Sequence, residues 1–305
     1  MPRAIVNDAD IPGGKIELEY ETFGSPTDPP ILLIMGFTAQ LTLWPEELCR
    51  RLADGGRFVI RFDNRDCGLS SKFDGVNVDL PGVIGSVMSE GATPMPPVPY
   101  TLSDMAADAA GLLDHLGLDA AHVVGASMGG MIAQTFAIDL PRRTLTLTSI
   151  MSMTGEPEYG QSTPEAGAAL LAPPPIERQA YIDASSTFMT WHSKKYRDAE
   201  KSRADAARDY DRSFYPQGAP RQLGAIYASG SRAEGLQALR TPTLVIHGRD
   251  DTLITPPGGF RTAELVDGST LLYVSDMGHD LPAPLIPAIA DAILSHTSRL
   301  AAVSK

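Results

Sequence analysis

Hydrophobic and polar positions alternate along the chain with a period of two in some segments and of about 3.6 in others. Residues 16–20 alternate apolar side chains with glutamates, which predicts a strand with one buried face, either antiparallel or at an edge. Residues 31–35 are continuously apolar, as in a parallel strand that is covered on both faces. Further strands are predicted at 58–62, 122–124, 145–151, 243–247 and 270–274.

Helical patterns separate these strands. From residue 102 to residue 116 the apolar side chains recur every three or four positions, which predicts a helix with one buried face. Comparable segments predict helices at 44–53, 128–140, 260–266 and 285–296. Strands that alternate with helices indicate the α/β class, with a mostly parallel twisted sheet flanked by helices on both faces.

Residues 155–235 interrupt this rhythm. The segment opens with glycine, proline and glutamate, contains three consecutive prolines from Pro173, and continues with helical patterns but no strand pattern. We therefore expect a helical cap over 155–235, inserted into a core domain of residues 1–154 and 236–305. A shorter apolar insertion spans 76–100. Because both insertions follow strands, and ligands of open α/β sheets bind at the carboxyl ends of strands, both should cover the same site.

One motif carries candidate chemistry, the Gly-x-Ser-x-Gly of residues 125–129, which stands between an apolar strand and a helix. In that context the pentapeptide predicts a nucleophile elbow, a tight turn that lifts the hydroxyl of Ser127 clear of the sheet. Side chains at Gly125 and Gly129 would collide with the turn and with the neighbouring strand. The backbone N–H of Met128 begins the helix, where unpaired N–H groups favour negative charge.

A serine nucleophile requires a base and a group that orients the base, and the ends of two later strands offer both. Asp250 and Asp251 follow the strand predicted at 243–247, and His279 follows the strand predicted at 270–274. The order serine, aspartate, histidine is that of α/β-hydrolases. His279 would accept the proton of Ser127 and return it to the leaving group. The residues alone leave Asp250 and Asp251 open as the acidic member.

Composition narrows the range of partners and cofactors. The 305 residues carry a formal net charge of −12, which argues against nucleic acid and anionic membrane surfaces as partners. No apolar run approaches the ~20 residues of a membrane span, and residues 1–14 lack the pattern of a signal peptide. Two cysteines make no disulfide framework, so a cytoplasmic protein with free thiols is expected. No zinc-spaced cluster or P-loop is present, so we expect neither metal nor cofactor.

Several stretches together carry a resemblance to a known family. They are Leu-Leu-Ile-Met-Gly at 32–36 with Trp-Pro at 44–45, Asp-Asn-Arg-Asp-Cys-Gly-Leu-Ser at 63–70, the elbow at 125–130, His-Gly-Arg-Asp-Asp at 247–251 and Met-Gly-His at 277–279. On these motifs the chain resembles the α/β-hydrolase superfamily over nearly its full length. Within it, the chain is similar to the actinobacterial esterase/lipase branch of carboxylesterases and aclacinomycin methylesterases.

The resemblance implies roles that the residues alone do not assign. In the family pattern His-Gly-x-x-Asp, the acidic member falls on Asp251. The second donor of the oxyanion hole falls on the backbone N–H of Phe37, which would act together with that of Met128. Many relatives carry histidine where this chain has Met35, but only a backbone N–H is needed there. The segment 63–70 is expected to be a structural turn, tied to the backbone by its Arg and Asp side chains.

These observations predict a cofactor-free serine hydrolase that cleaves carboxylic esters of apolar small molecules through an acyl-enzyme intermediate. A C–C bond hydrolase or a cofactor-free perhydrolase would use the same residues, and a ligand sensor would keep the pocket without turnover. A homo-oligomer is left open. Apolar side chains of the cap region are expected to seal the cap and to line the pocket, with Met88 and Met153 as adaptable contacts. These apolar side chains of the cap region are Tyr181, Phe188, Met189, Trp191, Phe214, Tyr215 and Tyr227.

Overall fold

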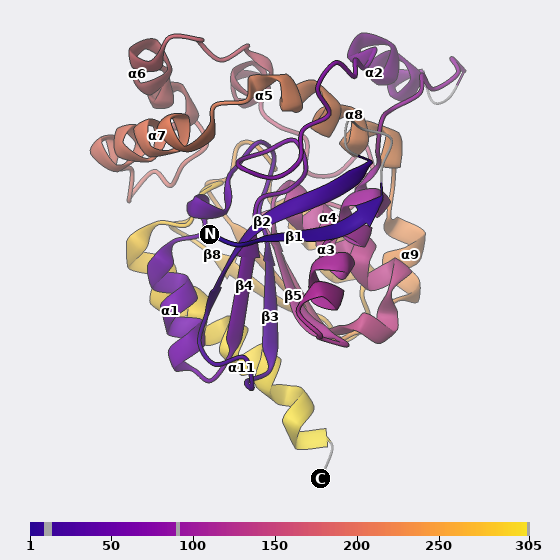
Figure 1. The fold of residues 1–305 in the computed structure, drawn as a ribbon, viewed down its shortest axis with the longest axis vertical. Helices are drawn as coiled ribbons and strands as arrows, with labels where there is room; N and C mark the ends of the chain where they lie inside the picture. Colours follow the sequence, from indigo (N-terminus) through magenta and orange to yellow (C-terminus); the bar gives the residue numbers. More distant parts are fainter. Residues whose placement is uncertain (9–13, 90–91, 304–305) are drawn as a thin grey trace.

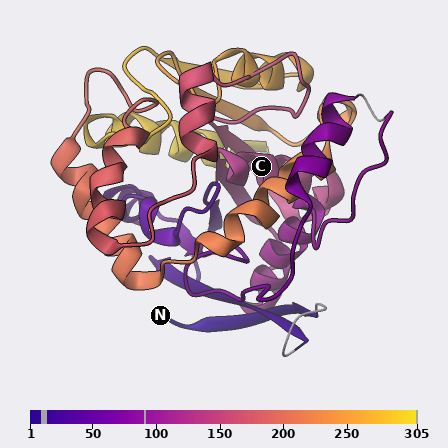
Figure 2. The same ribbon diagram turned by 90° about the horizontal axis from the view of Figure 1, so that it is seen from above.

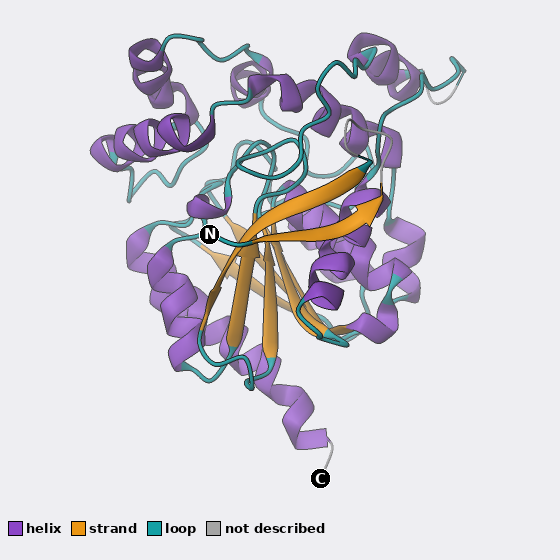
Figure 3. Cartoon of the chain, in the orientation of Figure 1, coloured by secondary structure: helices purple, strands orange, loops and turns teal. Residues whose placement is uncertain are grey.

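Within residues 1–8, 14–89 and 92–303, which the computed structural model describes, the chain forms one eight-stranded sheet (Figures 1 and 3). The strands follow the order β1-β2-β4-β3-β5-β6-β7-β8 across the sheet. They are β1 (Arg3–Asp8), β2 (Lys15–Phe23), β3 (Pro30–Ile34), β4 (Phe58–Phe62), β5 (Ala121–Ala126), β6 (Thr144–Ile150), β7 (Thr243–Gly248) and β8 (Thr270–Val274).

The direction and burial of the strands follow their sequence patterns. β2 is antiparallel to both β1 and β4, as its period of two indicates, and the other neighbouring pairs are parallel. The continuously apolar β3 and the mostly apolar β5 lie in the middle of the sheet, and β5 is buried at every position. β8 alternates half-buried and exposed positions because it is an edge strand. β1 is the one strand that the sequence patterns did not predict.

Helices cover both faces of the sheet, which confirms the predicted fold class. α1 (Glu46–Asp54) and α11 (Ile286–Val303) pack on one face. α3 (Leu102–His115), α4 (Met128–Asp139) and α10 (Pro257–Leu265) pack on the other. The two faces bury separate apolar clusters. The core therefore holds the sheet rigidly from both sides, and the loops at the strand ends project from a fixed frame.

The chain between β6 and β7 is helical, and so is the shorter insertion after β4. These helices are α2 (Leu80–Met88), α5 (Pro164–Leu171), α6 (Arg178–Phe188), α7 (Ala199–Ser213), α8 (Ala219–Ser229) and α9 (Ala233–Ala238). All but α9 lie over the carboxyl ends of the parallel strands, and α2 runs beside α8 (Figures 1 and 2). Short 3-10 helices occupy Leu41–Leu43, Pro141–Arg143, Pro216–Gly218 and Ala283–Leu285.

Helix α9 crosses the expected boundary between residues 235 and 236. It packs against α4 and α10, and its Leu236 is fully buried in the same apolar cluster as α3 and α4. The last turn of the inserted chain is thus anchored in the core.

Candidate active site

The turn at Ser127 joins β5 directly to α4, and its backbone is held in a strained conformation. Ser127 has φ 58° and ψ −123°, a region that residues with a side chain rarely adopt. A Cβ on Gly125 would come within 2.0 Å of the Gly129 carbonyl oxygen, and one on Gly129 within 2.0 Å of the Ile34 carbonyl oxygen. The elbow therefore requires glycine at both positions, as the motif predicts.

His279 and Asp251 reach Ser127 from the loops after β8 and β7. Ser127 Oγ lies 2.9 Å from His279 Nε2, and His279 Nδ1 lies 2.8 Å from Asp251 Oδ2. The other carboxylate oxygen of Asp251 accepts the backbone N–H groups of Leu253 and Ile254, both at 2.9 Å. The Asp251 side chain is fully buried. The three side chains form one hydrogen-bonded chain in which each orients the next.

The neighbouring Asp250 points elsewhere. Its Oδ1 lies 3.5 Å from Arg249 Nε and 3.9 Å from Lys194 Nζ, and its backbone N–H donates to the Met277 carbonyl. The structure thus brings Asp251, and not Asp250, against His279. This is the residue that the family pattern implied and that the sequence alone left open.

Two backbone N–H groups flank the Ser127 hydroxyl. In the described part of the chain, the N–H groups of Phe37 and Met128 donate no hydrogen bond. A Cβ on Gly36 would lie 3.5 Å from Ser127 Oγ, so the loop that carries Phe37 runs directly beside the serine. Met128 is the first residue of α4, where the helix dipole also favours negative charge. Both predicted donors are therefore near the serine and available to an anionic oxygen.

The loop that carries His279 is bonded to the inserted chain as well as to the core. The His279 backbone N–H donates to the Trp191 carbonyl at 2.7 Å. Asp280 Oδ1 accepts the N–H groups of Ser193 at 2.9 Å and of Gly278 at 3.2 Å. A Cβ on Gly278 would come within 2.4 Å of the Trp191 carbonyl oxygen, so glycine permits this close approach. The sequence analysis missed these contacts, although Asp280 stands directly after the candidate histidine.

The segment 63–70 is a structural turn, as expected. The carboxylate of Asp63 accepts the N–H groups of Leu41 and Leu69 at 2.7 and 2.8 Å, and it pairs with Arg212 from α7. Cys67 is buried in this turn, and burial raises the pKa of its thiol, so it stays protonated.

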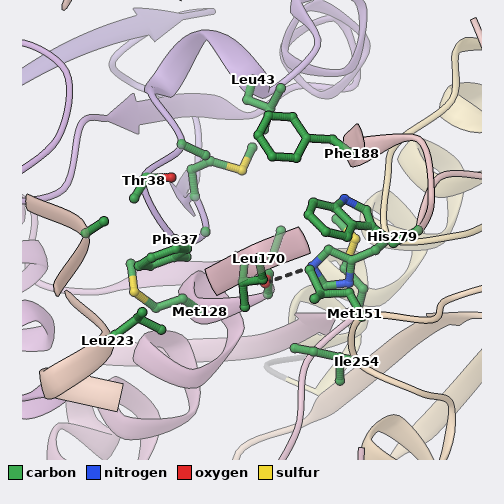
Figure 4. Close-up of a pocket in the computed structure, with 18 of the residues that line it drawn as sticks. Phe37, Thr38, Leu43, Met128, Met151, Leu170, Phe188, Leu223, Ile254 and His279 are labelled. Atoms are coloured by element: carbon green, nitrogen blue, oxygen red, sulfur yellow. Dashed lines mark hydrogen bonds between the residues drawn. The ribbon is translucent and has the colours of Figure 1, made fainter. Parts of the chain in front are cut away.

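A large apolar cavity is lined by Ser127 and His279, and Figure 4 shows part of its wall. Its volume is about 1880 Å³. In Figure 4, Phe37, Met128 and Leu223 lie on one side, and His279, Met151 and Ile254 on the other. Met88, Met153 and the predicted aromatic residues of the inserted chain also line it, whereas Met189 does not. A ligand in this cavity would therefore meet mostly hydrocarbon surface.

His192 is a polar lining residue that the sequence analysis did not single out. It belongs to the same inserted segment as Trp191 and lines the cavity. Burial, together with the nearby His279, lowers the pKa of His192 to about 4. This ring is therefore neutral near pH 7 and adds no charge beside His279.

No helix in the described ranges is long and apolar enough to cross a membrane. In those same ranges, no group of three or more His, Cys, Asp and Glu side chains is arranged to hold a metal ion.

Comparison with known proteins agrees with this architecture. Residues 29–282 match the family described as the alpha/beta hydrolase fold. The chain is 30% identical to the rhodomycin D methylesterase DnrP of Streptomyces peucetius, over 97% of this chain and 98% of that protein. It is 28% identical to the rhodomycin D methylesterase DauP of Streptomyces sp. strain C5, over 93% and 95%. A thermophilic esterase from Thermogutta terrifontis shares the fold, with a TM-score of 0.69, 22% identity and full coverage of both chains.

The chain therefore belongs to the α/β-hydrolase fold family. The resemblance inferred from the motifs, including the esterase branch, is confirmed.

Proposed function

We propose that Ser127, His279 and Asp251 hydrolyse a carboxylic ester through an acyl-enzyme intermediate. The chain is a carboxylic ester hydrolase, in keeping with its near full-length match to two methylesterases. The observation that carries the mechanism is the hydrogen-bonded chain from Ser127 through His279 to Asp251, next to two unbonded N–H groups.

The geometry supports a two-step reaction. Ser127 Oγ attacks the ester carbonyl while His279 Nε2 takes the hydroxyl proton, and Asp251 stabilises the imidazolium that forms. The N–H groups of Phe37 and Met128 bind the resulting oxyanion. Collapse breaks the bond to the alcohol, which leaves with the proton from His279. Water then attacks the acyl-enzyme by the same route, which releases the acid and restores Ser127.

The cavity supports an ester with a bulky, neutral and apolar acyl part. Small-molecule pockets usually measure about 300–1,000 Å³, and this cavity of about 1880 Å³ is larger. The two relatives are named as methylesterases, in which the alcohol is small and the acid carries the bulk of the substrate. We propose the same division here. We further propose that residues 155–235 act as the cap and residues 1–154 and 236–305 as the core.

Labelling of the serine tests this function. A fluorophosphonate probe should label the protein stoichiometrically, and Ser127→Ala should lose both the label and the hydrolysis of p-nitrophenyl butyrate. Peptide mapping should place the label on Ser127. A label on another residue, or full turnover in Ser127→Ala, would refute the mechanism. Labelling of Ser127 without ester turnover would favour the ligand-sensing alternative.

A further inference from the structure

We propose that Gln222, on helix α8 of the inserted chain, is a positioning residue for the oxyanion hole. The proposal rests on the proposed function, because it assigns the Phe37 N–H as an oxyanion donor. Gln222 does not touch the reacting atoms. It holds the loop that presents this donor, and it does so from a segment about 185 residues away in the sequence.

The donor loop is a tight turn with a strained corner. The Ala39 N–H donates to the Gly36 carbonyl at 3.3 Å, which closes a four-residue turn around Phe37 and Thr38. The Gly36 carbonyl belongs to the same peptide group as the Phe37 N–H, so the turn sets the direction of that donor. Thr38 has φ 54°, in the left-handed region that β-branched residues avoid. Such a conformation persists only where the surroundings enforce it.

Gln222 enforces the corner with both ends of its amide. Its Oε1 accepts the Thr38 N–H at 2.8 Å, and its Nε2 donates to the Arg65 carbonyl at 2.8 Å. The side chain is fully buried. The amide cannot be flipped, because one partner is a donor and the other an acceptor. Glutamine is therefore suited to this place, since it can accept and donate at fixed positions with one rigid group.

The core holds the other contacts of the loop. Asn64 Nδ2 donates to the Met35 carbonyl at 2.8 Å, and the Cys67 thiol lies 3.2 Å from the Thr38 carbonyl oxygen. Gln222 adds the bond to the Thr38 N–H, which no core side chain supplies among the described residues. Figure 4 shows Phe37 and Thr38 on the cavity wall. Without Gln222, the Thr38 N–H would be left without a partner and the strained corner could relax.

Relaxation of the corner would move the Phe37 N–H away from the oxyanion. Oxyanion donors act mainly in the transition state, so their displacement lowers kcat more than it changes KM. A displacement of about 1 Å can reduce the rate by about 100-fold. A residue that merely holds the inserted chain in place would change substrate binding or thermal stability instead.

The test compares three substitutions of Gln222 with one control on the same helix. Gln222→Met keeps the length but loses the amide, and Gln222→Asn keeps the amide but is too short to reach both partners. Gln222→Glu retains an acceptor for the Thr38 N–H. The control is Ser229→Ala, which removes a hydrogen bond of 2.9 Å from the Leu102 N–H to α8 and does not line the cavity. Rates are measured with p-nitrophenyl butyrate and divided by fluorophosphonate-titrated active sites.

We expect Gln222→Met and Gln222→Asn to lower kcat by about 10- to 100-fold with KM within about twofold. Affinity for a short alkyl trifluoromethyl ketone, which forms an anionic hemiketal on the serine, should fall by the same factor. Gln222→Glu should lose less only in its protonated form, which can both accept from the Thr38 N–H and donate to the Arg65 carbonyl. Ser229→Ala should change neither value by more than about twofold. The proposal would be overturned if a folded Gln222→Met or Gln222→Asn variant kept both its kcat and its affinity for the ketone. If instead Ser127→Ala is active, the proposed function itself fails.

Discussion

Asp251→Asn is expected to reverse the direction of the hydrogen bonds along the candidate triad. In the native chain, Asp251 Oδ1 accepts two backbone N–H groups, from Leu253 and Ile254. An asparagine must keep its oxygen at that position, because its NH₂ group would otherwise face two donors. The NH₂ group then occupies the place of Oδ2, 2.8 Å from His279 Nδ1. His279 must present a lone pair there, so its proton moves to Nε2.

The size of the effect follows from that change of tautomer. With its proton on Nε2, His279 donates to Ser127 Oγ and cannot accept the hydroxyl proton. Rotation of the asparagine amide would restore the productive tautomer only by leaving buried N–H groups unsatisfied, at about 1–3 kcal/mol each. The equivalent change in a serine protease lowers kcat by about 10⁴. We expect a loss of about 10³- to 10⁴-fold here, with little change in KM.

The assay is steady-state hydrolysis of p-nitrophenyl butyrate, with thermal unfolding measured in parallel. Asp250→Asn is the matched control, because Asp250 contacts Arg249 and Lys194 and does not reach His279. It should retain kcat within about threefold, because its cationic partners Arg249 and Lys194 are exposed and ion pairs of this kind contribute ~0–1 kcal/mol. Equal losses in the two variants, or the larger loss in Asp250→Asn, would refute the reasoning.

Three further predictions concern packing, pH and substrate size. Gly125→Ala should lower the free energy of unfolding in urea by about 1–3 kcal/mol, because the new Cβ would overlap the Gly129 carbonyl. The control Gly85→Ala places its Cβ in open space, so it should be neutral or stabilising. Burial, with Arg57 and His296 nearby, lowers the pKa of His122 to about 4. Its contribution to stability is therefore complete above the unfolded pKa of ~6.5 and is lost as pH falls, by about 2 kcal/mol between pH 7.5 and pH 5. His122→Asn should remove that part of the pH dependence, and an unchanged slope would contradict the assignment. With p-nitrophenyl esters longer than acetate, kcat/KM should rise by up to about fourfold for each added methylene until the acyl pocket is filled. This factor corresponds to about 0.8 kcal/mol for each buried methylene. A steady fall in kcat/KM from acetate would show that the cavity does not bind the acyl chain.

The sequence predicted those parts of the molecule whose signals are local. The elbow at Ser127 is encoded by a strand, two glycines and a helix within about twenty residues, and the structure has that turn. β1 was missed because its six residues show no clean alternation and its pairing with β2 contains a register shift after Ile5. Its position depends on a partner strand, and a short window cannot reveal that partner.

Local sequence patterns did not predict which of Asp250 and Asp251 faces His279. The two carboxylates are adjacent in sequence and chemically identical, and what separates them is the direction of each side chain after β7. That direction is set by the N–H groups of Leu253 and Ile254, which bind Asp251 and turn it toward the interior. The family pattern implied the outcome, but the residues alone carried no information about this turn.

The contacts between the inserted chain and the core change what that chain can be expected to do. The Trp191 carbonyl binds the backbone of His279 on one side of Ser127, and Gln222 binds the backbone of Thr38 on the other. These are the loops that carry the candidate base and one candidate oxyanion donor. Both bonds are main-chain contacts on the core side, so side-chain substitutions in the core would leave them in place. The inserted chain therefore shapes the pocket and also holds two loops of the proposed catalytic geometry. A cap exchanged between relatives to alter specificity must preserve both contacts, or turnover will fall even for esters that still bind.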